Sequence, residues 1–443
     1  MTISPLRLSL VVPAFAALLS ACGSSDDAAP PVAVSTGGSG GAGAAASGGG
    51  GGGSPKGGAA GASAGKGGSA GSAGKAATAG NAGAAGKASG GAGGGSSTGG
   101  SAGAAGGNGG VGGASGGQGG AAPALEDVHV SGRTEKMGAT HRFGWSGVSF
   151  ATRFSGTGLS VVLEDGGSSN ELEVIVDDAP HPERTITVKS GMQTYPVIDA
   201  LPAGEHTAVV HRRTEGSVGT TTFHGFTVQG GAIVPSPSPY KHRIEIIGDS
   251  ISCGYGTECM SANEAFSTKT ENHWITYGAI TARNLAADAH TIAWSGKGLV
   301  ENYGTDTSAK MPELYPRTFA TAAAPAWDFA SWQAEVVVID LGTNDWNHNP
   351  PVDPATFEAA YNSLADTIEG HYPGVRVFGV GNTFDAKAQV QAVKNAMSGK
   401  PNRHYIEFGI LGSEGACCQH PCAVTHARWA KELTQAIQAA TGW

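Results

Sequence analysis

Residues 37–122 contain no aromatic residue, no acidic residue and, apart from Val111, no large aliphatic residue. More than half of the 73 glycines in the chain of 443 residues lie in this segment. Such a composition cannot bury enough apolar surface to offset the conformational entropy lost on folding, so residues 23–122 are predicted to form a disordered linker rich in Gly, Ala and Ser. Glycine follows no three-residue period there, which excludes a collagen-like triple helix.

Beyond residue 22 the sequence also lacks any run of about 18 consecutive apolar residues, so no transmembrane helix is expected in the mature protein. Residues 1–22 contain one arginine, then a short apolar run and small residues, as in a secretory signal peptide. The last four, Leu-Ser-Ala-Cys, resemble the lipobox of bacterial lipoproteins, in which Cys22 becomes the lipid-bearing first residue. The sequence therefore predicts an exported protein, anchored by the lipid on Cys22 to the bacterial outer membrane or cell surface, with an ordinary secretory signal as the alternative.

Basic residues are scarce in the rest of the chain. The formal net charge is −9, and four lysines but no acid lie in the glycine-rich segment, so the part after Ala122 is more acidic than this value suggests. A region with a net negative charge repels phosphate backbones, which argues against nucleic acid as a partner. The length of this part corresponds to two domains of ordinary size.

Residues 123–235 show the alternation of apolar and polar residues that is typical of half-buried strands. Val148, Phe150 and Phe154 alternate with their neighbours, and glycine turns follow at short intervals. No convincing helical period interrupts this pattern, which predicts an all-β sandwich domain. Three prolines within residues 233–241 then predict an extended connector to the next domain.

Residues 241–443 alternate short buried runs with stretches of helical period. Five runs are predicted to be strands, and four stretches are predicted to be helices. The strands are RIEIIGD, HTIAWSG, EVVVIDLG, VRVFGVGN and YIEFGIL, and the helices span residues 274–287, 357–369, 386–397 and 424–439. This alternation indicates an α/β domain with a five-stranded parallel sheet that helices cover on both faces.

Polar residues follow the carboxyl ends of these strands, where parallel sheets hold their active groups. Ser250 lies at the turn after the first strand, where backbone N–H groups point at a developing anion. Gly296 follows the second strand and Asn344 the third, and both add hydrogen-bond donors. His420 lies between the last strand and the last helix, from where its imidazole could reach the serine. Each motif alone is typical of an ordinary turn, but their occurrence in this order at successive strand ends is not expected by accident.

These four positions match the four sequence blocks of the SGNH (GDSL) hydrolases. More narrowly, IGDSISCGYG, WSGKGLVENYG, MPELYPRT, LGTNDW and HPCAVTHARWAKEL resemble carbohydrate esterase family 2, as do GWSGVSFATRFSGTGLSVVLED and LPAGEHTAVVHRRTEGSVGTTTFHGFTV in the first domain. The resemblance implies an SGNH-type α/β/α sandwich preceded by a jelly-roll-like domain. It also implies a serine esterase that removes O-acetyl groups from plant polysaccharides such as xylan and glucomannan, with no metal or other cofactor.

Carried over position by position, the resemblance implies that Ser250 is the nucleophile and that His420 is the general base that takes its proton. The backbone N–H groups of Ser250 and Gly296 and the side chain of Asn344 would form the oxyanion hole. Asp345 is expected to be structural and to orient its loop.

One position departs from the family pattern. Relatives with a full catalytic triad carry an aspartate two residues before the histidine, and here that residue is Cys418. We therefore expect a Ser-His dyad in which a backbone carbonyl holds the imidazole in the tautomer that leaves Nε2 free. Glu414 is an alternative carboxylate for this role.

Besides Cys22 the sequence contains five cysteines, at positions 253, 259, 417, 418 and 422. Outside the cytoplasm they should tend to pair, but an odd number leaves one thiol over. Proximity suggests a bond between Cys253 and Cys259, and another between Cys422 and either Cys417 or Cys418. A metal site made from the last three cysteines and a histidine is an alternative, although its spacing fits no usual zinc pattern.

Trp346, beside the oxyanion asparagine, and Tyr315 could present aromatic faces to a sugar ring, and packing in the core explains them equally well. Two other functions stay open. Cys418 in place of the acid suggests a carbohydrate-binding protein whose esterase site has decayed, and the superfamily also contains general esterases and lipases. Turnover on acetylated xylan or glucomannan discriminates the first alternative, and acyl chain-length preference the second.

Overall fold

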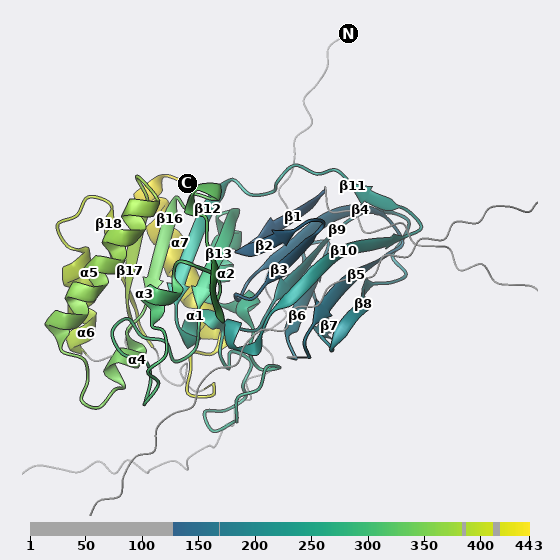
Figure 1. The fold of residues 1–443 in the computed structure, drawn as a ribbon. Helices are drawn as coiled ribbons and strands as arrows, with labels where there is room; N and C mark the ends of the chain where they lie inside the picture. The colour runs from purple at the N-terminus through teal and green to yellow at the C-terminus, as the bar shows by residue number, and fades with distance from the viewer. Residues whose placement is uncertain (1–126, 168, 383–386, 411–416) are drawn as a thin grey trace, which may run out of the picture. The chain divides into compact units, whose positions relative to one another are not determined.

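The structure of the protein, a computed structural model, describes residues 127–167, 169–382, 387–410 and 417–443. The signal sequence with Cys22, the glycine-rich linker and Glu414 lie outside the described residues, so their predictions stay predictions. The described chain forms an all-β region followed by an α/β region (Figure 1). Of the helices described, none combines the length and the apolar character that crossing a bilayer requires.

The all-β region consists of two antiparallel sheets. The first has the order β1-β4-β9-β6-β7 with β11 paired to β4, and the second has the order β2-β3-β10-β5-β8. The strands of the first sheet are β1 (Val128–Ser131), β4 (Ser149–Gly156), β6 (Glu171–Val176), β7 (Ala179–Thr187), β9 (Gly204–Arg212) and β11 (Ala232–Val234). Those of the second are β2 (Thr134–Met137), β3 (Thr140–Phe143), β5 (Gly158–Asp165), β8 (Gly191–Ile198) and β10 (Thr221–Gln229). This arrangement confirms the prediction of an all-β domain.

Alternation along the strands places every second side chain in the core. On β5 the side chains of Leu159 and Val161 are fully buried, and on β4 Phe150 stacks on Phe223 with ring centroids 3.9 Å apart. Burial of a side chain of this size stabilises the fold by about 1.5–3 kcal/mol, so the alternation decides which face of each strand turns inward. Because β11 pairs with β4, the extended connector begins after Val234, slightly later than predicted.

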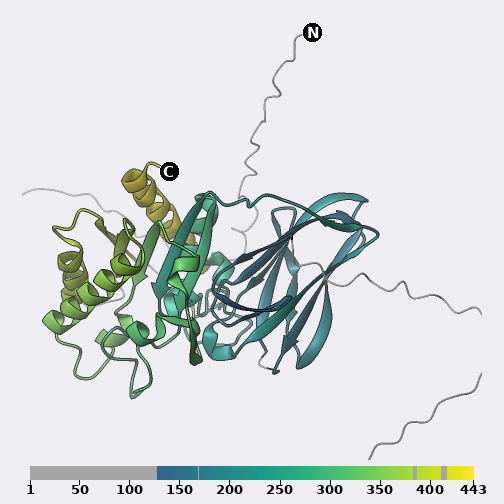
Figure 2. The same ribbon diagram turned by 45° about the horizontal axis from the view of Figure 1, so that its top comes forward.

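The α/β region has a five-stranded sheet with the order β13-β12-β16-β17-β18, in which every neighbouring pair is parallel. Its strands are β12 (His242–Gly248), β13 (Ala287–Ala293), β16 (Val336–Asp340), β17 (Arg376–Asn382) and β18 (Arg403–Phe408). Its longer helices are α2 (Tyr277–Asn284), α5 (Pro354–His371), α6 (Lys387–Met397) and α7 (Ala423–Thr441). Helices α2 and α7 share a hydrophobic cluster with one face of the sheet, and α5 and α6 share another with the opposite face (Figure 2). The predicted parallel sheet, covered on both faces, is therefore confirmed.

The first strand of this sheet, β12, lies between the second and the third. The chain from β13 to β16 must therefore cross β12, and the carboxyl ends of these three strands form the switch point at which open parallel sheets bind ligands. The register pairs Gly248 with both Ala293 and Asp340, so the three strands end at the same level.

Helix boundaries differ most from the prediction in α2 and α5. The helix expected for residues 274–287 is the shorter α2, because Ala287 already pairs with β12 as the first residue of β13. Helix α5 begins earlier than predicted, since Asp353 accepts a hydrogen bond from the Thr356 backbone N–H and Pro354 fits the first turn. The sequence patterns also did not predict four short elements between β13 and β16: α3 (Met311–Leu314), β14 (Arg317–Phe319), β15 (Ala322–Ala326) and the 3-10 turn η3 (Phe329–Ser331).

A buried ion pair joins the all-β region to the parallel sheet. The Arg133 guanidinium lies 2.8 Å from the Glu245 carboxylate on β12, and neither side chain has exposed surface. The hydroxyl groups of Tyr315 and Tyr372 donate to the same carboxylate at 2.9 and 3.3 Å. Each charge depends on the other, because an isolated charge would lose its hydration here without compensation.

Replacing Arg133 with alanine should lower the free energy of unfolding by about 3–5 kcal/mol, because the Glu245 carboxylate then stays buried without its cation. Arg153→Ala is a matched control, since the Arg153–Glu205 pair is exposed and such pairs contribute about 0–1 kcal/mol. Urea unfolding of both variants beside the parent measures the two losses. Equal losses would contradict the role given to burial.

Candidate active site

Ser250 is the first residue of a short helix, α1 (Ser250–Cys253), directly after β12. Asp249 caps this helix, since its carboxylate accepts a hydrogen bond of 3.0 Å from the Ile251 backbone N–H. The helix ends at Gly254, whose φ of +87° and close approach to neighbouring backbone leave no room for a side chain. This tight strand-to-helix turn places Ser250 at the carboxyl edge of the sheet.

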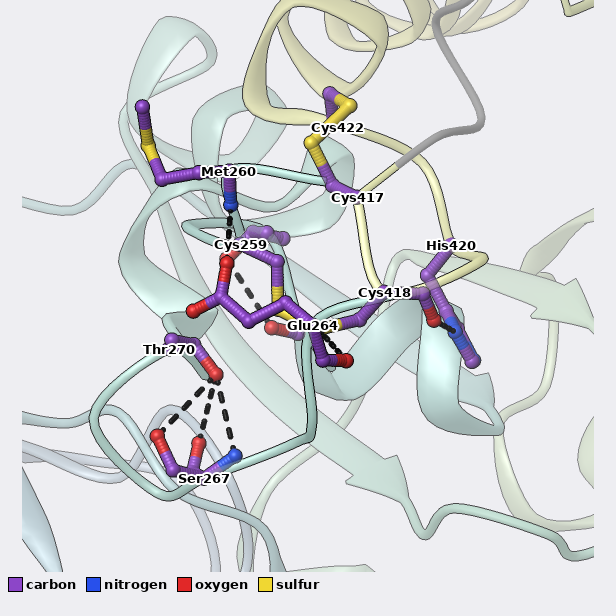
Figure 3. Close-up of a disulfide and its surroundings, with 11 residues drawn as sticks. Cys259, Met260, Glu264, Ser267, Thr270, Cys417, Cys418, His420 and Cys422 are labelled. Carbon is purple, nitrogen blue, oxygen red and sulfur yellow. Dashed lines mark hydrogen bonds between the residues drawn. A yellow bond between two sulfur atoms is a disulfide. The ribbon is translucent and has the colours of Figure 1, made fainter. Parts of the chain in front are cut away.

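His420 reaches the serine from a two-residue turn before α7. Cys417 and His420 pair as an isolated antiparallel bridge, and Cys418 and Gln419 between them both have positive φ. The His420 Nε2 atom lies 2.9 Å from the Ser250 Oγ, across 170 residues of sequence. Its Nδ1 atom lies 3.0 Å from the Cys418 carbonyl oxygen (Figure 3). Because a carbonyl only accepts, Nδ1 carries the proton and Nε2 is free to accept from the serine hydroxyl.

Burial lowers the pKa of His420 below its ordinary value of 6.5, while the bond to the Cys418 carbonyl and the charge of Glu215 act in the opposite direction. The imidazole is therefore neutral at neutral pH, which is the state that can accept the Ser250 proton. The Tyr255 ring contacts one side of the imidazole, with ring centroids 4.4 Å apart. The structure thus brings the two predicted catalytic residues into hydrogen-bonding distance.

Two further groups stand at the ends of the neighbouring strands. Gly296, after β13, has a φ of +77°, a conformation that favours glycine. Asn344 lies in α4 (Thr343–Trp346) after β16, and its side-chain amide donates to the Lys297 carbonyl at 2.9 Å and to the Asp249 carboxylate at 3.1 Å. The amide therefore joins the loops that follow all three strands.

Asp345 has the structural position that the sequence suggested. Its carboxylate accepts hydrogen bonds of 2.9, 2.6 and 2.8 Å from the backbone N–H groups of Leu299, Val300 and Glu301. These three bonds hold the loop after Gly296 against α4.

The two aromatic residues expected at the sugar site lie in different environments. Tyr315 is 1% exposed and donates its hydroxyl to Glu245 in the core, so the prediction that it contacts substrate is wrong. Its hydroxyl helps to compensate a buried charge, which is why it turns inward. Trp346 is half-buried, and its ring packs edge-on against Phe357 with centroids 5.9 Å apart.

Tyr303 is a candidate that the sequence patterns did not single out. Its side chain is 61% exposed, and its backbone N–H donates to the Gly296 carbonyl at 2.8 Å. An adjacent hollow is lined by Glu301, Gly304, Thr305, Asp306, Asn347 and His348. The signal that could have found Tyr303 is its place near the end of the WSGKGLVENYG segment.

The cysteines pair differently from the first expectation. Disulfides join Cys259 to Cys418 and Cys417 to Cys422, and Cys253 is a buried free thiol. The pair Cys253–Cys259 is therefore wrong, because the Cys253 side chain turns from α1 into the core, and the pair Cys417–Cys422 is confirmed. A metal site made from Cys417, Cys418 and Cys422 is wrong as well, since all three sulfur atoms are bonded in disulfides.

Glu215, Cys253 and Glu271 form a group of potential metal ligands among the described residues, with ligand atoms within 4.8 Å of one another. All three are buried, and burial raises the pKa of Cys253 and Glu271 well above their ordinary values. Burial therefore favours the protonated forms of the thiol and of this carboxyl, whereas metal ligands must be deprotonated. This favours a buried polar cluster over a metal site.

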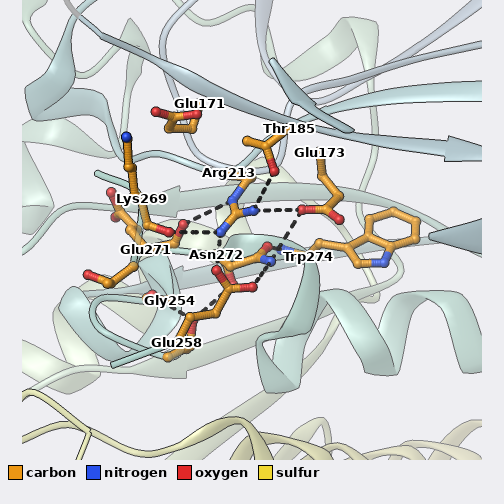
Figure 4. Close-up of polar contacts among 12 residues, drawn as sticks. Glu171, Glu173, Thr185, Arg213, Gly254, Glu258, Lys269, Glu271, Asn272 and Trp274 are labelled. Carbon is orange, nitrogen blue, oxygen red and sulfur yellow. Dashed lines mark hydrogen bonds and ion pairs between the residues drawn. The ribbon is translucent and has the colours of Figure 1, made fainter. Parts of the chain in front are cut away.

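Arg213 supports the segment that follows α1. Figure 4 shows its guanidinium between the carboxylates of Glu173 on β6 and Glu258, and it also donates to the backbone carbonyls of Lys269 and Glu271. Because Arg213 directly follows β9, the all-β region holds the loop between α1 and α2 in place.

The two regions match known families. Residues 130–237 match the family described as Carbohydrate esterase 2 N-terminal, and residues 246–409 match the GDSL-like Lipase/Acylhydrolase family. The cellulase/esterase CelE of Acetivibrio thermocellus is 36% identical over 310 residues, which cover 68% of this chain and 38% of CelE. An acetylxylan esterase/glucomannan deacetylase of Cellvibrio japonicus is 27% identical over 334 residues, which cover 72% of this chain and 91% of that protein.

A solved family two carbohydrate esterase from Clostridium thermocellum, in complex with cellohexaose, is similar over 71% of this chain and 99% of that chain, with 34% identity and a TM-score of 0.68. The fold and these matches define the class of the protein, an esterase with a GDSL-like hydrolase domain. Within that class, the chain belongs to carbohydrate esterase family 2. The chain spans 38% of the length of CelE, so the activities of that whole protein are not assigned to it.

The burial of His420 predicts where activity is lost at acid pH. Only the neutral imidazole can take the serine proton, and its pKa is lowered from 6.5, so kcat/KM for 4-nitrophenyl acetate should reach half of its plateau below this pH. A pH profile of kcat/KM measures the midpoint. A midpoint at or above 6.5 would contradict the effect assigned to burial.

Proposed function

We propose that this protein removes O-acetyl groups from plant-type polysaccharides such as xylan and glucomannan through an acyl-serine intermediate. The observation that carries this proposal is the distance of 2.9 Å between His420 Nε2 and Ser250 Oγ. The relatives include an acetylxylan esterase/glucomannan deacetylase and an esterase solved with cellohexaose, which supports a carbohydrate ester as the substrate.

In the acylation step, His420 accepts the hydroxyl proton while the Ser250 oxygen attacks the carbonyl carbon of the acetyl group. The tetrahedral intermediate then collapses, the bond to the sugar oxygen breaks, and His420 returns the proton to that oxygen. In deacylation a water molecule attacks in the same way, and acetate leaves. One imidazole thus acts as base and then as acid in both steps.

A Ser-His dyad is sufficient for this chemistry because the Cys418 carbonyl holds the imidazole. The carbonyl fixes the tautomer as a carboxylate would. It carries no full charge, however, so it stabilises the imidazolium less. The lowered pKa of His420 agrees with a base that gives up its proton readily to the departing sugar.

Hydrogen bonds from the backbone N–H groups of Ser250 and Gly296 and from the Asn344 amide would stabilise the negative charge on the acetyl oxygen of the tetrahedral intermediate. The Ser250 N–H lies at the start of α1, where helical N–H groups have no acceptor within the helix. In the free enzyme the Asn344 amide nitrogen donates to two protein oxygens. Donation to the oxyanion therefore requires that one of these bonds be shared or exchanged when substrate binds.

Tyr303 and Trp346 are the aromatic residues that we propose for contact with the sugar. Tyr303 lies in the loop that carries Gly296, and Trp346 lies in α4, which carries Asn344. Tyr303 is exposed, and its backbone N–H donates to the Gly296 carbonyl. An exposed aromatic ring offers a rigid apolar surface to the flat face of a sugar, together with a polar edge.

Export and a lipid anchor at Cys22 suit this function, because the polysaccharide lies outside the cell. The linker of residues 23–122 would then separate the membrane from the folded regions. A flexible chain rich in glycine and serine allows such a tethered enzyme to search its surroundings.

The alternative functions receive less support. Cys418 in place of an aspartate suggests a carbohydrate-binding protein whose esterase site has decayed. The Cys418 carbonyl, however, accepts a hydrogen bond from His420 Nδ1, so the imidazole is oriented without a carboxylate. A general esterase or lipase would share the same pair. It would differ in cleaving long acyl esters faster than acetate.

Replacing Ser250 with alanine should abolish release of 4-nitrophenol from its acetate ester and of acetate from acetylated xylan, because the acyl intermediate can no longer form. Ser252→Ala is the control in the same helix, since the Ser252 hydroxyl bonds to Tyr277 at 2.8 Å rather than to the imidazole. This control should retain turnover. Turnover by a correctly folded Ser250→Ala variant, as judged by circular dichroism, would refute the assignment.

Replacing Asn344 with alanine should lower kcat about 10²- to 10³-fold, roughly 2.7–4 kcal/mol of transition-state stabilisation, because one oxyanion donor is lost. Asn347→Ala is the matched control, since this exposed amide, directly after α4, donates to the Thr343 carbonyl at the start of that helix. Steady-state kinetics on 4-nitrophenyl acetate measure both effects. A change in KM with an unaltered kcat would argue against an oxyanion role.

A further inference from the structure

We infer that the disulfide between Cys259 and Cys418 positions the general base, a role that the resemblance assigns to an aspartate in relatives with a full triad. This inference rests on the proposed function, in which Ser250 and His420 share a proton. The disulfide joins positions 159 residues apart in sequence, with Cα atoms separated by 5.7 Å. Cys418 is at once the partner of Cys259 and the residue whose carbonyl accepts from His420 Nδ1.

The bridge connects the two loops between which the proton moves. Cys259 lies in the loop that follows Ser250 and α1, and Cys418 lies two residues before His420. The Cys418 backbone N–H also donates to the Ser261 carbonyl at 2.9 Å. A covalent bond and a backbone hydrogen bond therefore fasten the turn that carries the base to the loop of the nucleophile.

The turn that carries the base needs support from outside. Cys418 and Gln419 have φ values of +50° and +61°. Two-residue turns with positive φ at both positions are usually formed by Asn-Gly, Asp-Gly or Gly-Gly, and neither Cys nor Gln favours this conformation. The direction of the Cys418 carbonyl, which decides where the imidazole is held, therefore depends on contacts beyond the turn.

The loop after α1 packs closely around the bridge. A Cβ atom at Gly256, which has a φ of +64°, would lie only 2.7 Å from the Cys418 Cβ and 3.2 Å from the Cys259 Sγ. The neighbouring Tyr255 contacts the His420 ring. The imidazole is thus held at Nδ1 by the Cys418 carbonyl and on its side by Tyr255, and both supports depend on this loop.

The second disulfide differs in what it connects. Cys417 and Cys422 are five residues apart, and Cys422 is the N-cap residue of α7. Their bond closes a small loop around His420 but makes no connection to the loop after Ser250. It therefore provides a matched control within the same segment.

A disulfide that only stabilises the fold would leave kcat of the folded enzyme unchanged. One that positions the base should lower kcat and leave KM for a small ester nearly unchanged, because the lost interaction acts on the transition state. Misplacement of a catalytic group by about 1 Å can reduce the rate about 10²-fold. The separate effects on kcat and KM are thus the deciding observation.

The test uses the full chain with Cys417→Ser/Cys422→Ser, in which Cys259–Cys418 is the remaining disulfide of the described residues. Dithiothreitol reduces it with two electrons and two protons and is itself oxidised to its cyclic disulfide, and mass spectrometry after alkylation reports the two new thiols. As both thiols appear, kcat for 4-nitrophenyl acetate should fall about 10- to 100-fold with little change in KM. Reoxidation should restore kcat.

Cys259→Ser/Cys418→Ser is the complementary variant. It should show the low kcat without reductant and should not respond to dithiothreitol. Circular dichroism at the assay temperature establishes that both variants are folded. If this variant does not fold, titration of the folded Cys417→Ser/Cys422→Ser variant with reductant gives the same comparison.

An unchanged kcat after reduction of Cys259–Cys418 would overturn the inference, and so would an equal loss of kcat on removal of Cys417–Cys422 alone. The Ser250→Ala variant in the same assay tests the proposed function separately. If that variant is inactive while reduction of the bridge has no effect, the inference fails and the proposed function stands. If it is active, the proposed function itself fails.

Discussion

The hydrogen bond between the Ser250 hydroxyl and the His420 imidazole, 2.9 Å long, is the interaction on which the site depends. Its two residues are 170 positions apart in sequence. They can meet because the strands of the sheet are parallel, so that the turns after β12 and β18 leave from the same edge. The sheet determines where these loops begin, and contacts between the loops determine the positions of the two side chains.

The all-β region contributes to this geometry from outside the sheet. Arg213 binds the loop between α1 and α2 through the backbone carbonyls of Glu271 and Lys269 and through the Glu258 carboxylate. A chain of hydrogen bonds also crosses from β4 to β13, through Ser149, His211, His273 and Thr291. Burial lowers the pKa of both histidines, so both are neutral and the chain needs no compensating charge. The region thus acts as a support for the strand and the loop that flank the nucleophile.

Local patterns predicted the layers of the fold because burial alternates with a short period along a strand or a helix. They also placed Ser250, Gly296 and Asn344 at strand ends, since strand ends are visible in the sequence. The direction in which a side chain points cannot be predicted from these local patterns. Tyr315 appears suited to a sugar ring, yet its hydroxyl turns inward to Glu245, and Cys253 lies close to Cys259 in sequence although its thiol enters the core. Such outcomes depend on partners more than fifty residues away.

Cys418 stands where the resemblance implies an aspartate in relatives with a full triad; its carbonyl accepts from His420 Nδ1, and its sulfur is bonded to Cys259. The most direct test of the Ser250–His420 pair is to locate, by peptide mass spectrometry, the covalent adduct that a phosphonate ester forms with the enzyme. A Ser250 nucleophile activated by His420 should give a single adduct on Ser250 that forms far more slowly in a His420→Ala variant. An enzyme that hydrolyses 4-nitrophenyl acetate but carries the adduct on another residue would contradict it.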